Sequence, residues 1–157
     1  QFTMAMQKLE LSHDLKELLK CFLTHEVRFL VIGGHAVSFH GYPRFTKDLD
    51  IWIERSEANA VKIVSALREY GFDYDSLSTE MFTDDSRMTQ MGHEPNRVDI
   101  LHKIKGVQFD ECYERSKRAI VDDTLVPIID KPDLIRNKLA TARPQDMADA
   151  SALSELR

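Results

Sequence analysis

Three aspartates stand where the sequence predicts buried strands, a setting in which carboxylates are costly. Asp48 and Asp50 alternate with Leu49 and Ile51, so strand periodicity places both carboxylates on one face. Asp99 lies between two β-branched residues on another expected strand. Crowded carboxylates are tolerated where a hard divalent cation binds between them, and two such ions can support an in-line displacement at phosphorus. The three acids are therefore the candidate catalytic and metal-binding residues.

A pair of glycines precedes the first two acids. The apolar run Phe29–Ile32 predicts a buried strand that leads into Gly33 and Gly34, with a short helix expected from His35. Glycines allow close approach to the backbone, and the free N–H groups at a helix start favour phosphate. A phosphate-binding turn beside paired carboxylates predicts metal-dependent phosphoryl or nucleotidyl transfer. A purely structural strand-to-helix turn is the alternative.

The combined pattern resembles a known superfamily. Hydrophobic-Gly-Gly, a spacer of thirteen residues, Asp-hydrophobic-Asp and a later hydrophobic-Asp-hydrophobic are similar to the DNA-polymerase-β-like nucleotidyltransferases. Within that superfamily the chain resembles the small members related to AbiEii-type toxins, and the resemblance extends from the first strand to the last helix. Two segments carry this closer similarity: Arg44-x-Thr46-x-Asp48-x-Asp50 and Lys138-x-x-x-x-Arg143-x-x-Asp146-x-x-Asp149.

The resemblance implies an activity and roles for residues. A nucleoside monophosphate would pass from a nucleoside triphosphate to an acceptor hydroxyl, with release of pyrophosphate and with two Mg²⁺ or Mn²⁺ ions. Asp48, Asp50 and Asp99 would hold the metals, and Asp99 would also help to deprotonate the acceptor. Many members carry serine after the first glycine, and His35 could replace it as a donor. The implied nucleotide-binding residues are Gly33, Gly34, His35, Arg44, Thr46, Lys138 and Arg143.

Several of these residues have structural alternatives. Asp99 could form a salt bridge with Arg97 or Arg87. Lys138 lies within the apolar stripe of a helix expected over 132–142, from which a lysine can extend into solvent. Alternatively, its ammonium reaches a phosphate or a carboxylate in the site. Asp146 is expected to be structural, because an acid in the first turn of a helix complements the helix dipole.

Apolar spacing and turn residues predict the elements that position these side chains. Helices are expected over 12–26, 35–40, 56–70, 109–117, 132–142 and from 144 to the C-terminus. Strands are expected over 29–32, 49–53 and 96–104, with weaker ones at 80–82 and 87–91 and a hairpin of 119–121 with 125–127. The order predicts an α/β fold, a nucleotidyltransferase-like short mixed β-sheet flanked by helices, with a small helical C-terminal element over 130–157.

Composition limits the function classes. The 157 residues are expected to form a single domain, with 1–3 an addition to the native sequence. A net charge of −5 argues against a binder of duplex DNA. No apolar run reaches the roughly 18 residues of a membrane helix, and no leader is recognised. Cys21 and Cys112 stand in no metal-type spacing, which indicates free thiols and a cytoplasmic location.

Three classes of acceptor are compatible with these residues. A tRNA end, a protein hydroxyl and a small molecule such as an aminoglycoside-like antibiotic all remain open. The resemblance suggests a toxin–antitoxin role with an antitoxin-type protein partner. The alternative function is a catalytically silent protein of the same fold that binds nucleotide or a partner protein.

Overall fold

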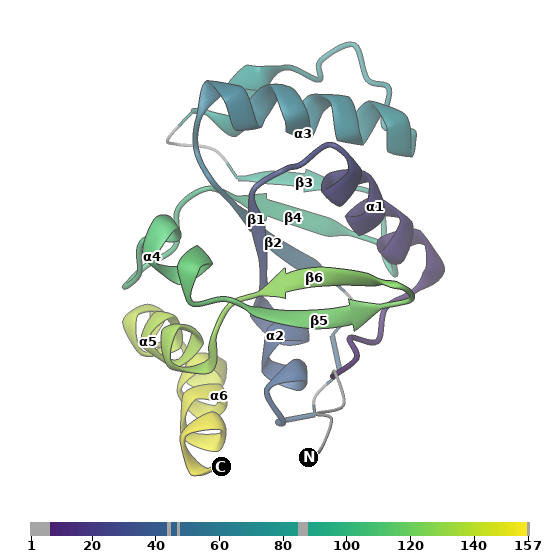
Figure 1. Cartoon of the computed structure of the whole chain (residues 1–157). Helices are drawn as coiled ribbons and strands as arrows, with labels where there is room; N and C mark the ends of the chain where they lie inside the picture. Colours follow the sequence, from purple (N-terminus) through teal and green to yellow (C-terminus); the bar gives the residue numbers. More distant parts are fainter. Residues whose placement is uncertain (1–6, 44, 47, 85–87, 157) are drawn as a thin grey trace.

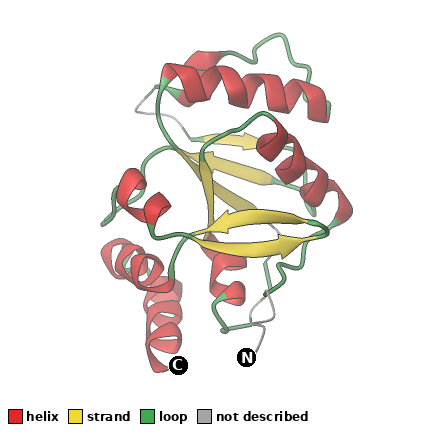
Figure 2. Cartoon of the chain, viewed as in Figure 1, coloured by secondary structure: helices red, strands yellow, loops and turns green. Residues whose placement is uncertain are grey.

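A six-stranded mixed sheet lies at the centre of the computed structural model, which describes residues 7–43, 45–46, 48–84 and 88–156 (Figures 1 and 2). The strands run in the order β3-β4-β2-β1-β6-β5. Two neighbouring pairs are parallel, β2 with β4 and β1 with β6, and the others are antiparallel. The strand bounds are β1 Phe29–Ile32, β2 Leu49–Ile53, β3 Thr89–Met91, β4 Val98–Leu101, β5 Lys117–Val121 and β6 Thr124–Ile128.

Six α-helices and one short 3₁₀ helix surround this sheet in the described residues. In Figure 1, α1 and α3 lie side by side at one end of the view, and α5 and α6 form a pair at the other. The predicted class, a mixed sheet flanked by helices, is confirmed. The helix bounds are α1 His13–Thr24, α2 Gly33–Phe39, α3 Glu57–Tyr70, η1 Thr79–Phe82, α4 Phe109–Glu114, α5 Lys131–Thr141 and α6 Pro144–Glu155.

Side-chain caps fix the starts of the long helices. The Ser12 hydroxyl accepts a hydrogen bond from the Leu15 backbone N–H at the start of α1. Ser56 does the same for Asn59 at the start of α3. Such caps contribute about 1 kcal/mol each, because they satisfy backbone donors that the helix leaves free.

The core gathers around β1, whose four residues are all buried between β2 and β6. Phe22 of α1 packs edge-on against Phe29 of β1, with ring centroids 5.5 Å apart. Each large side chain buried in this way contributes roughly 1.5–3 kcal/mol. The central strands are therefore a rigid base for the polar residues at their ends.

Several predicted elements differ from the structure. The strand expected over 96–104 covers only Val98–Leu101, and the helix expected over 109–117 ends at Glu114, with Lys117 beginning β5. Residues 80–82 do not form a strand but belong to η1, where the Thr83 and Asp84 N–H groups donate to the Glu80 carbonyl. A run this short is too brief for hydrophobic periodicity to distinguish strand from helix. The helix expected from His35 begins two residues earlier, at Gly33. Residues 1–3 lie outside the described part of the chain, as do Arg44 and Arg87.

In the described residues, no helix is both long and apolar enough to cross a membrane.

Candidate active site

The parallel pairing of β2 with β4 brings the candidate acids together. Asp50 and Asp99 are direct partners in this register, so their side chains lie on the same face of the sheet. Asp48 comes immediately before β2. All three line one cavity of about 550 Å³. The sheet thus gathers three carboxyl groups that lie up to 51 residues apart in sequence.

The ionisation of Asp50 is strongly perturbed. Burial, followed by the negative charges of Asp99 and Asp48, raises the pKa of Asp50 from 3.8 to about 7. The Lys138 ammonium opposes this shift. Near neutral pH a proton therefore relieves part of the repulsion among the three acids.

Arg97 binds two of the acids. Its Nε and Nη2 atoms lie 3.1 Å from Asp99 Oδ1 and Oδ2, respectively. The same Nη2 lies 3.5 Å from Asp48 Oδ2. The salt bridge between Asp99 and Arg97, one of the alternatives drawn from the sequence, is therefore present, and it extends to Asp48.

The donor set suits a hard divalent cation. Asp48 Oδ1 is buried and has no hydrogen-bond partner in the structure as described. A dication would supply that partner and would also favour the ionised form of Asp50, and carboxylate oxygens are the ligands that Mg²⁺ prefers. Across the described ranges, however, no three His, Cys, Asp or Glu side chains form a ready-made metal cluster. The carboxyl groups would have to adjust to bind an ion.

The two glycines let α2 begin against the acid-bearing strand. Gly33 has φ +68°, and a β-carbon there would lie 2.9 Å from Asp50 Cγ and closer still to its Oδ2. At Gly34 a β-carbon would lie 2.9 Å from Thr46 Oγ1. Thr46 in turn donates from Oγ1 to the Asp48 carbonyl at 3.3 Å. Gly33, Gly34 and Thr46 all line the cavity, and a side chain at either glycine would disturb the acid strand or its neighbour.

His35 lies on the other side of this turn. It lines a separate hollow with Phe39, Phe45 and Thr46. Burial lowers the pKa of His35, although the Asp48 charge opposes that effect. Its Nε2 is buried and is without a hydrogen-bond partner in the described structure. The neutral ring is near the acids but is not among the residues that line their cavity.

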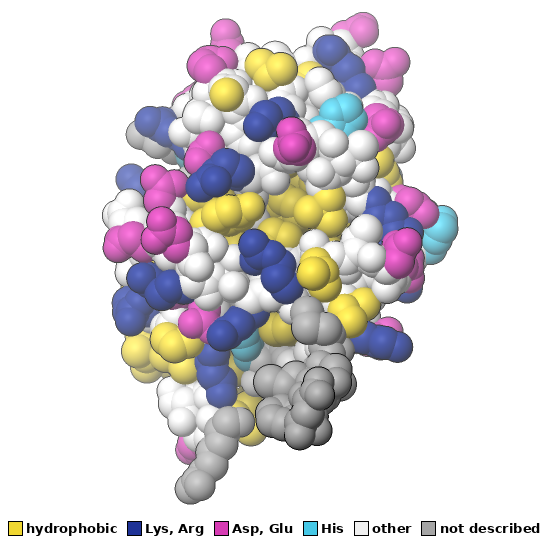
Figure 3. Space-filling view, in the orientation of Figure 1, with side chains coloured by type: hydrophobic (Ala, Val, Ile, Leu, Met, Phe, Trp, Pro, Cys, Tyr) yellow, Lys and Arg dark blue, Asp and Glu magenta, His cyan; other side chains and the backbone are white. Residues whose placement is uncertain are grey.

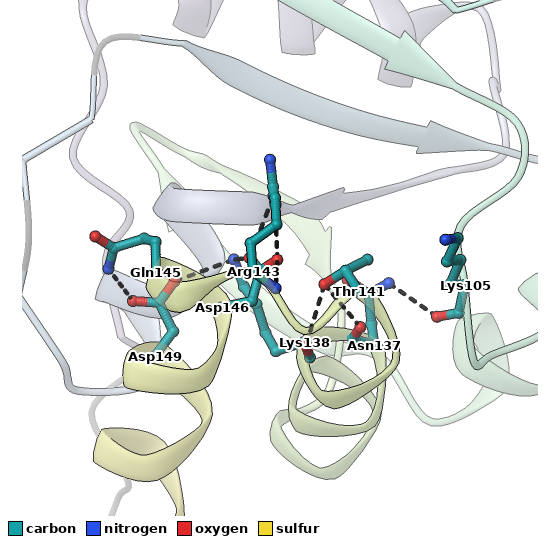
Figure 4. A network of polar contacts seen from close by, with 8 residues as sticks. All are labelled: Lys105, Asn137, Lys138, Thr141, Arg143, Gln145, Asp146 and Asp149. Atoms are coloured by element: carbon teal, nitrogen blue, oxygen red, sulfur yellow. Dashed lines mark hydrogen bonds and ion pairs between the residues drawn. The ribbon is translucent and has the colours of Figure 1, made fainter.

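Lys138 of α5 lines the cavity and also contacts acids of α6 (Figure 4). It is 6% exposed, so it does not extend into solvent. Its ammonium lies 3.1 Å from Asp149 Oδ2 and 3.4 Å from Asp146 Oδ1, both buried acids of α6. The Lys138 ammonium therefore binds carboxylates, which agrees with one of the two predicted alternatives. These carboxylates belong to α6 and are not the three candidate acids.

Arg143 and Asp146 fix the start of α6. Arg143 Nε donates to Asp146 Oδ2 at 2.7 Å, and the Arg143 backbone N–H donates to the same oxygen at 3.2 Å. Burial opposes ionisation of Asp146, but the hydrogen bonds from Arg143 and Thr141 and the charge of Lys138 hold its pKa well below its usual range. This geometry agrees with the structural role predicted for Asp146.

Residues 11–157 match the profile of a family described as "Nucleotidyl transferase of unknown function (DUF2204)". The chain belongs to this DUF2204 nucleotidyl transferase family. It is therefore an enzyme of the nucleotidyltransferase class, as the sequence pattern predicted. No curated protein matches the sequence significantly.

Solved nucleotidyltransferase structures share the fold of this DUF2204 protein. The lincosamide antibiotic adenylyltransferase LnuA, determined with lincomycin bound, aligns with a TM-score of 0.59 and 17% identity over 94% of this chain and 98% of that one. A protein of Thermotoga maritima described as a nucleotidyltransferase aligns with a TM-score of 0.55 and 16% identity, over 90% of this chain and 88% of that one. An antigenic nucleotidyltransferase-like protein from Paracoccidioides brasiliensis aligns at 0.56, with 16% identity over 95% and 78%.

The DUF2204 cavity also has basic residues that the sequence did not single out. Lys103 and Lys105 line it from the loop after β4. Asn137 of α5 holds this loop by donating from Nδ2 to the Lys105 carbonyl at 2.9 Å (Figure 4). The alternation of the two lysines was visible in the sequence, but the packing of α5 against their loop was not.

Proposed function

We propose that this nucleotidyl transferase moves a nucleoside monophosphate from a nucleoside triphosphate to an acceptor hydroxyl, releases pyrophosphate and depends on Mg²⁺ or Mn²⁺. The main support is the register of Asp50 against Asp99 at the edge of a cavity that also contains the Gly33–Gly34 turn. Carboxylates beside a glycine turn, whose backbone a phosphate can approach closely, can hold a metal-bound triphosphate while an acceptor approaches in line.

The acids and the glycines of the cavity have proposed tasks. Asp48, Asp50 and Asp99 would hold two ions, which when bound polarise the α-phosphate and lower the pKa of the acceptor hydroxyl. Asp99 would also help to take the proton of the acceptor hydroxyl. For this step Arg97 must first leave at least one of the two Asp99 carboxylate oxygens that it binds. Gly33 and Gly34 would admit the triphosphate to the backbone.

The polar residues around the acids would orient the phosphates. Thr46 supports the acid strand through the Asp48 carbonyl and offers its hydroxyl to the cavity. Lys138 and Arg143 line the same cavity, but each is partly neutralised by carboxylates of α6, so their attraction for phosphate is reduced. Arg44 and His35 also belong to the set proposed from the sequence, but His35 lines the neighbouring hollow and not this cavity.

The acceptor is proposed to be a molecule that enters this cavity rather than a long nucleic-acid duplex. Acidic and basic side chains are interspersed on the face shown in Figure 3, and the net charge is −5. The likeness to an antibiotic adenylyltransferase of nearly equal length favours a small-molecule hydroxyl, with a tRNA end or a protein hydroxyl as the other outcomes of the test. A cytoplasmic location and a toxin–antitoxin partnership remain predictions from the sequence.

A catalytically silent nucleotide-binding protein is the second candidate. Its specific support is Arg97, whose ion pairs with Asp48 and Asp99 engage carboxylate oxygens that a catalytic metal would use. A single assay distinguishes the catalytic transferase from the silent nucleotide-binding protein. Each α-labelled nucleoside triphosphate is incubated with the protein, Mg²⁺ or Mn²⁺ and fractions of a bacterial lysate, and the products are separated by size and charge. Label that moves to an acceptor with wild type but not with Asp50→Asn supports catalysis. Nucleotide binding without transfer in any fraction supports the silent protein.

A further inference from the structure

Arg97 occupies the position between two of the carboxylates proposed to bind metal. One guanidinium nitrogen, Nη2, lies 3.1 Å from Asp99 Oδ2 and 3.5 Å from Asp48 Oδ2. Nε binds the other Asp99 oxygen. Three of the four oxygens of this pair of acids therefore already face a cation, and the fourth, Asp48 Oδ1, has no hydrogen-bond partner in the described residues.

The other cations with defined ion pairs at the cavity are engaged elsewhere. Lys138 binds the α6 acids Asp146 and Asp149, and Arg143 binds Asp146. Among the ion pairs of the described residues, those to Asp48 and Asp99 come from Arg97. A metal that bridges these two acids must therefore share their oxygens with the guanidinium or displace it.

We propose that Arg97 is an internal counter-ion that competes with the divalent metal, and that the nucleoside triphosphate releases it, so that metal and nucleotide bind cooperatively. This inference rests on the proposed metal-dependent function. The Arg97 side chain is 33% exposed and so has room to move. A guanidinium binds phosphate oxygens in the same two-pronged manner as a carboxylate. The triphosphate thus offers Arg97 a new partner as the metal takes the acids, and by linkage each ligand strengthens the binding of the other.

The test measures metal binding directly. Free Mn²⁺ is followed by electron paramagnetic resonance in titrations of wild type, Arg97→Gln and Arg68→Gln, each without and with the α,β-methylene analogue of ATP. Arg68 is an exposed residue of α3 that does not line the cavity, so its variant controls for the loss of one positive charge. Without nucleotide, Arg97→Gln should bind Mn²⁺ at least about tenfold more tightly than wild type or Arg68→Gln, a change of about 1.4 kcal/mol. The gain in Mn²⁺ affinity caused by the analogue should be smaller in Arg97→Gln.

Circular dichroism establishes whether Arg97→Gln is folded. If it is not, Arg97→Lys replaces it: the charge is kept but the fork that spans both acids is lost, so Mn²⁺ should again bind more tightly than in Arg68→Gln. A folded variant that binds Mn²⁺ no more tightly than Arg68→Gln overturns the inference and leaves the proposed function standing, provided that wild type binds Mn²⁺ with the analogue. Mn²⁺ that binds to none of the proteins in either condition overturns the metal-dependent function itself.

Discussion

The raised pKa of Asp50 makes the stability of the metal-free protein depend on pH in a defined direction. In the folded chain the carboxyl titrates near pH 7, whereas its ordinary value is 3.8. Between these values the folded state holds a proton that the unfolded state has lost, so folding stability falls as pH rises through this window. Each pH unit costs up to about 1.4 kcal/mol, and the full shift corresponds to about 4 kcal/mol as an upper limit.

The effect appears in thermal melts in EDTA at pH 5 and pH 8. Over that interval Asp50 should destabilise wild type by about 2–3 kcal/mol, which for a chain of this size is a fall in melting temperature of roughly 5–10 °C. Asp50→Asn is neutral at both pH values and should escape this fall, so that at pH 8 it equals or exceeds wild type in stability. Titrating groups that do not interact with Asp50 cancel in the comparison, because both proteins carry them.

Asp73→Asn is the matched control, since Asp73 is exposed and does not line the cavity. Its melting temperature should follow that of wild type from pH 5 to pH 8. The reasoning is refuted if wild type and Asp50→Asn differ by the same amount at both pH values. It is also refuted if wild type gains stability relative to Asp50→Asn at the higher pH.

Three further outcomes follow from the same geometry. Gly33→Ala should reduce the rate of transfer at least about tenfold, because the added β-carbon meets the Asp50 carboxyl. Gly71→Ala is the control, since Gly71 has φ +122° and open space around it. This variant should lose only about 1–2 kcal/mol of stability to backbone strain and should keep its activity. Steady-state transfer rates and urea unfolding of the two variants separate these effects. Lys138→Met should lower the free energy of unfolding by about 3–5 kcal/mol in urea, because it leaves buried Asp149 without its ammonium partner; a loss below about 1 kcal/mol would contradict this role. Millimolar Mg²⁺ or Mn²⁺ should raise the melting temperature of wild type, by about 2.7 kcal/mol in stability at a hundredfold excess over Kd, and the shift should be blunted in Asp50→Asn; an equal shift in both proteins would place the metal elsewhere.

Much of the fold could be predicted because local signals agree with it. The apolar run Phe29–Ile32 forms β1 with the predicted bounds, and the alternating segment Leu49–Ile53 forms β2. Cap and stop residues also acted as expected, with Ser56 and Gly71 bounding α3. Periodicity failed at 80–82, where a few residues suit either a strand or a helical turn.

The site was less predictable because its geometry depends on tertiary contacts. The pairing of Asp50 with Asp99 follows from a strand order that no local pattern specifies. The partners of Lys138 depend on how α6 folds back on α5, so the sequence left carboxylate and phosphate as alternatives. Arg97 was visible as a neighbour of Asp99 in sequence, but its contact with Asp48 appears only when β2 and β4 are side by side.

The central claim is that the cavity acids transfer a nucleotidyl group. It is tested most directly by incubating the protein with Mg²⁺, an acceptor-containing lysate fraction and ATP, GTP, CTP or UTP labelled at either the α- or the γ-phosphate. The account predicts that α-label moves to the acceptor, that γ-label appears as pyrophosphate, and that Asp50→Asn does neither. Transfer of γ-label to the acceptor, or transfer of α-label by Asp50→Asn within about fivefold of wild type, would contradict it.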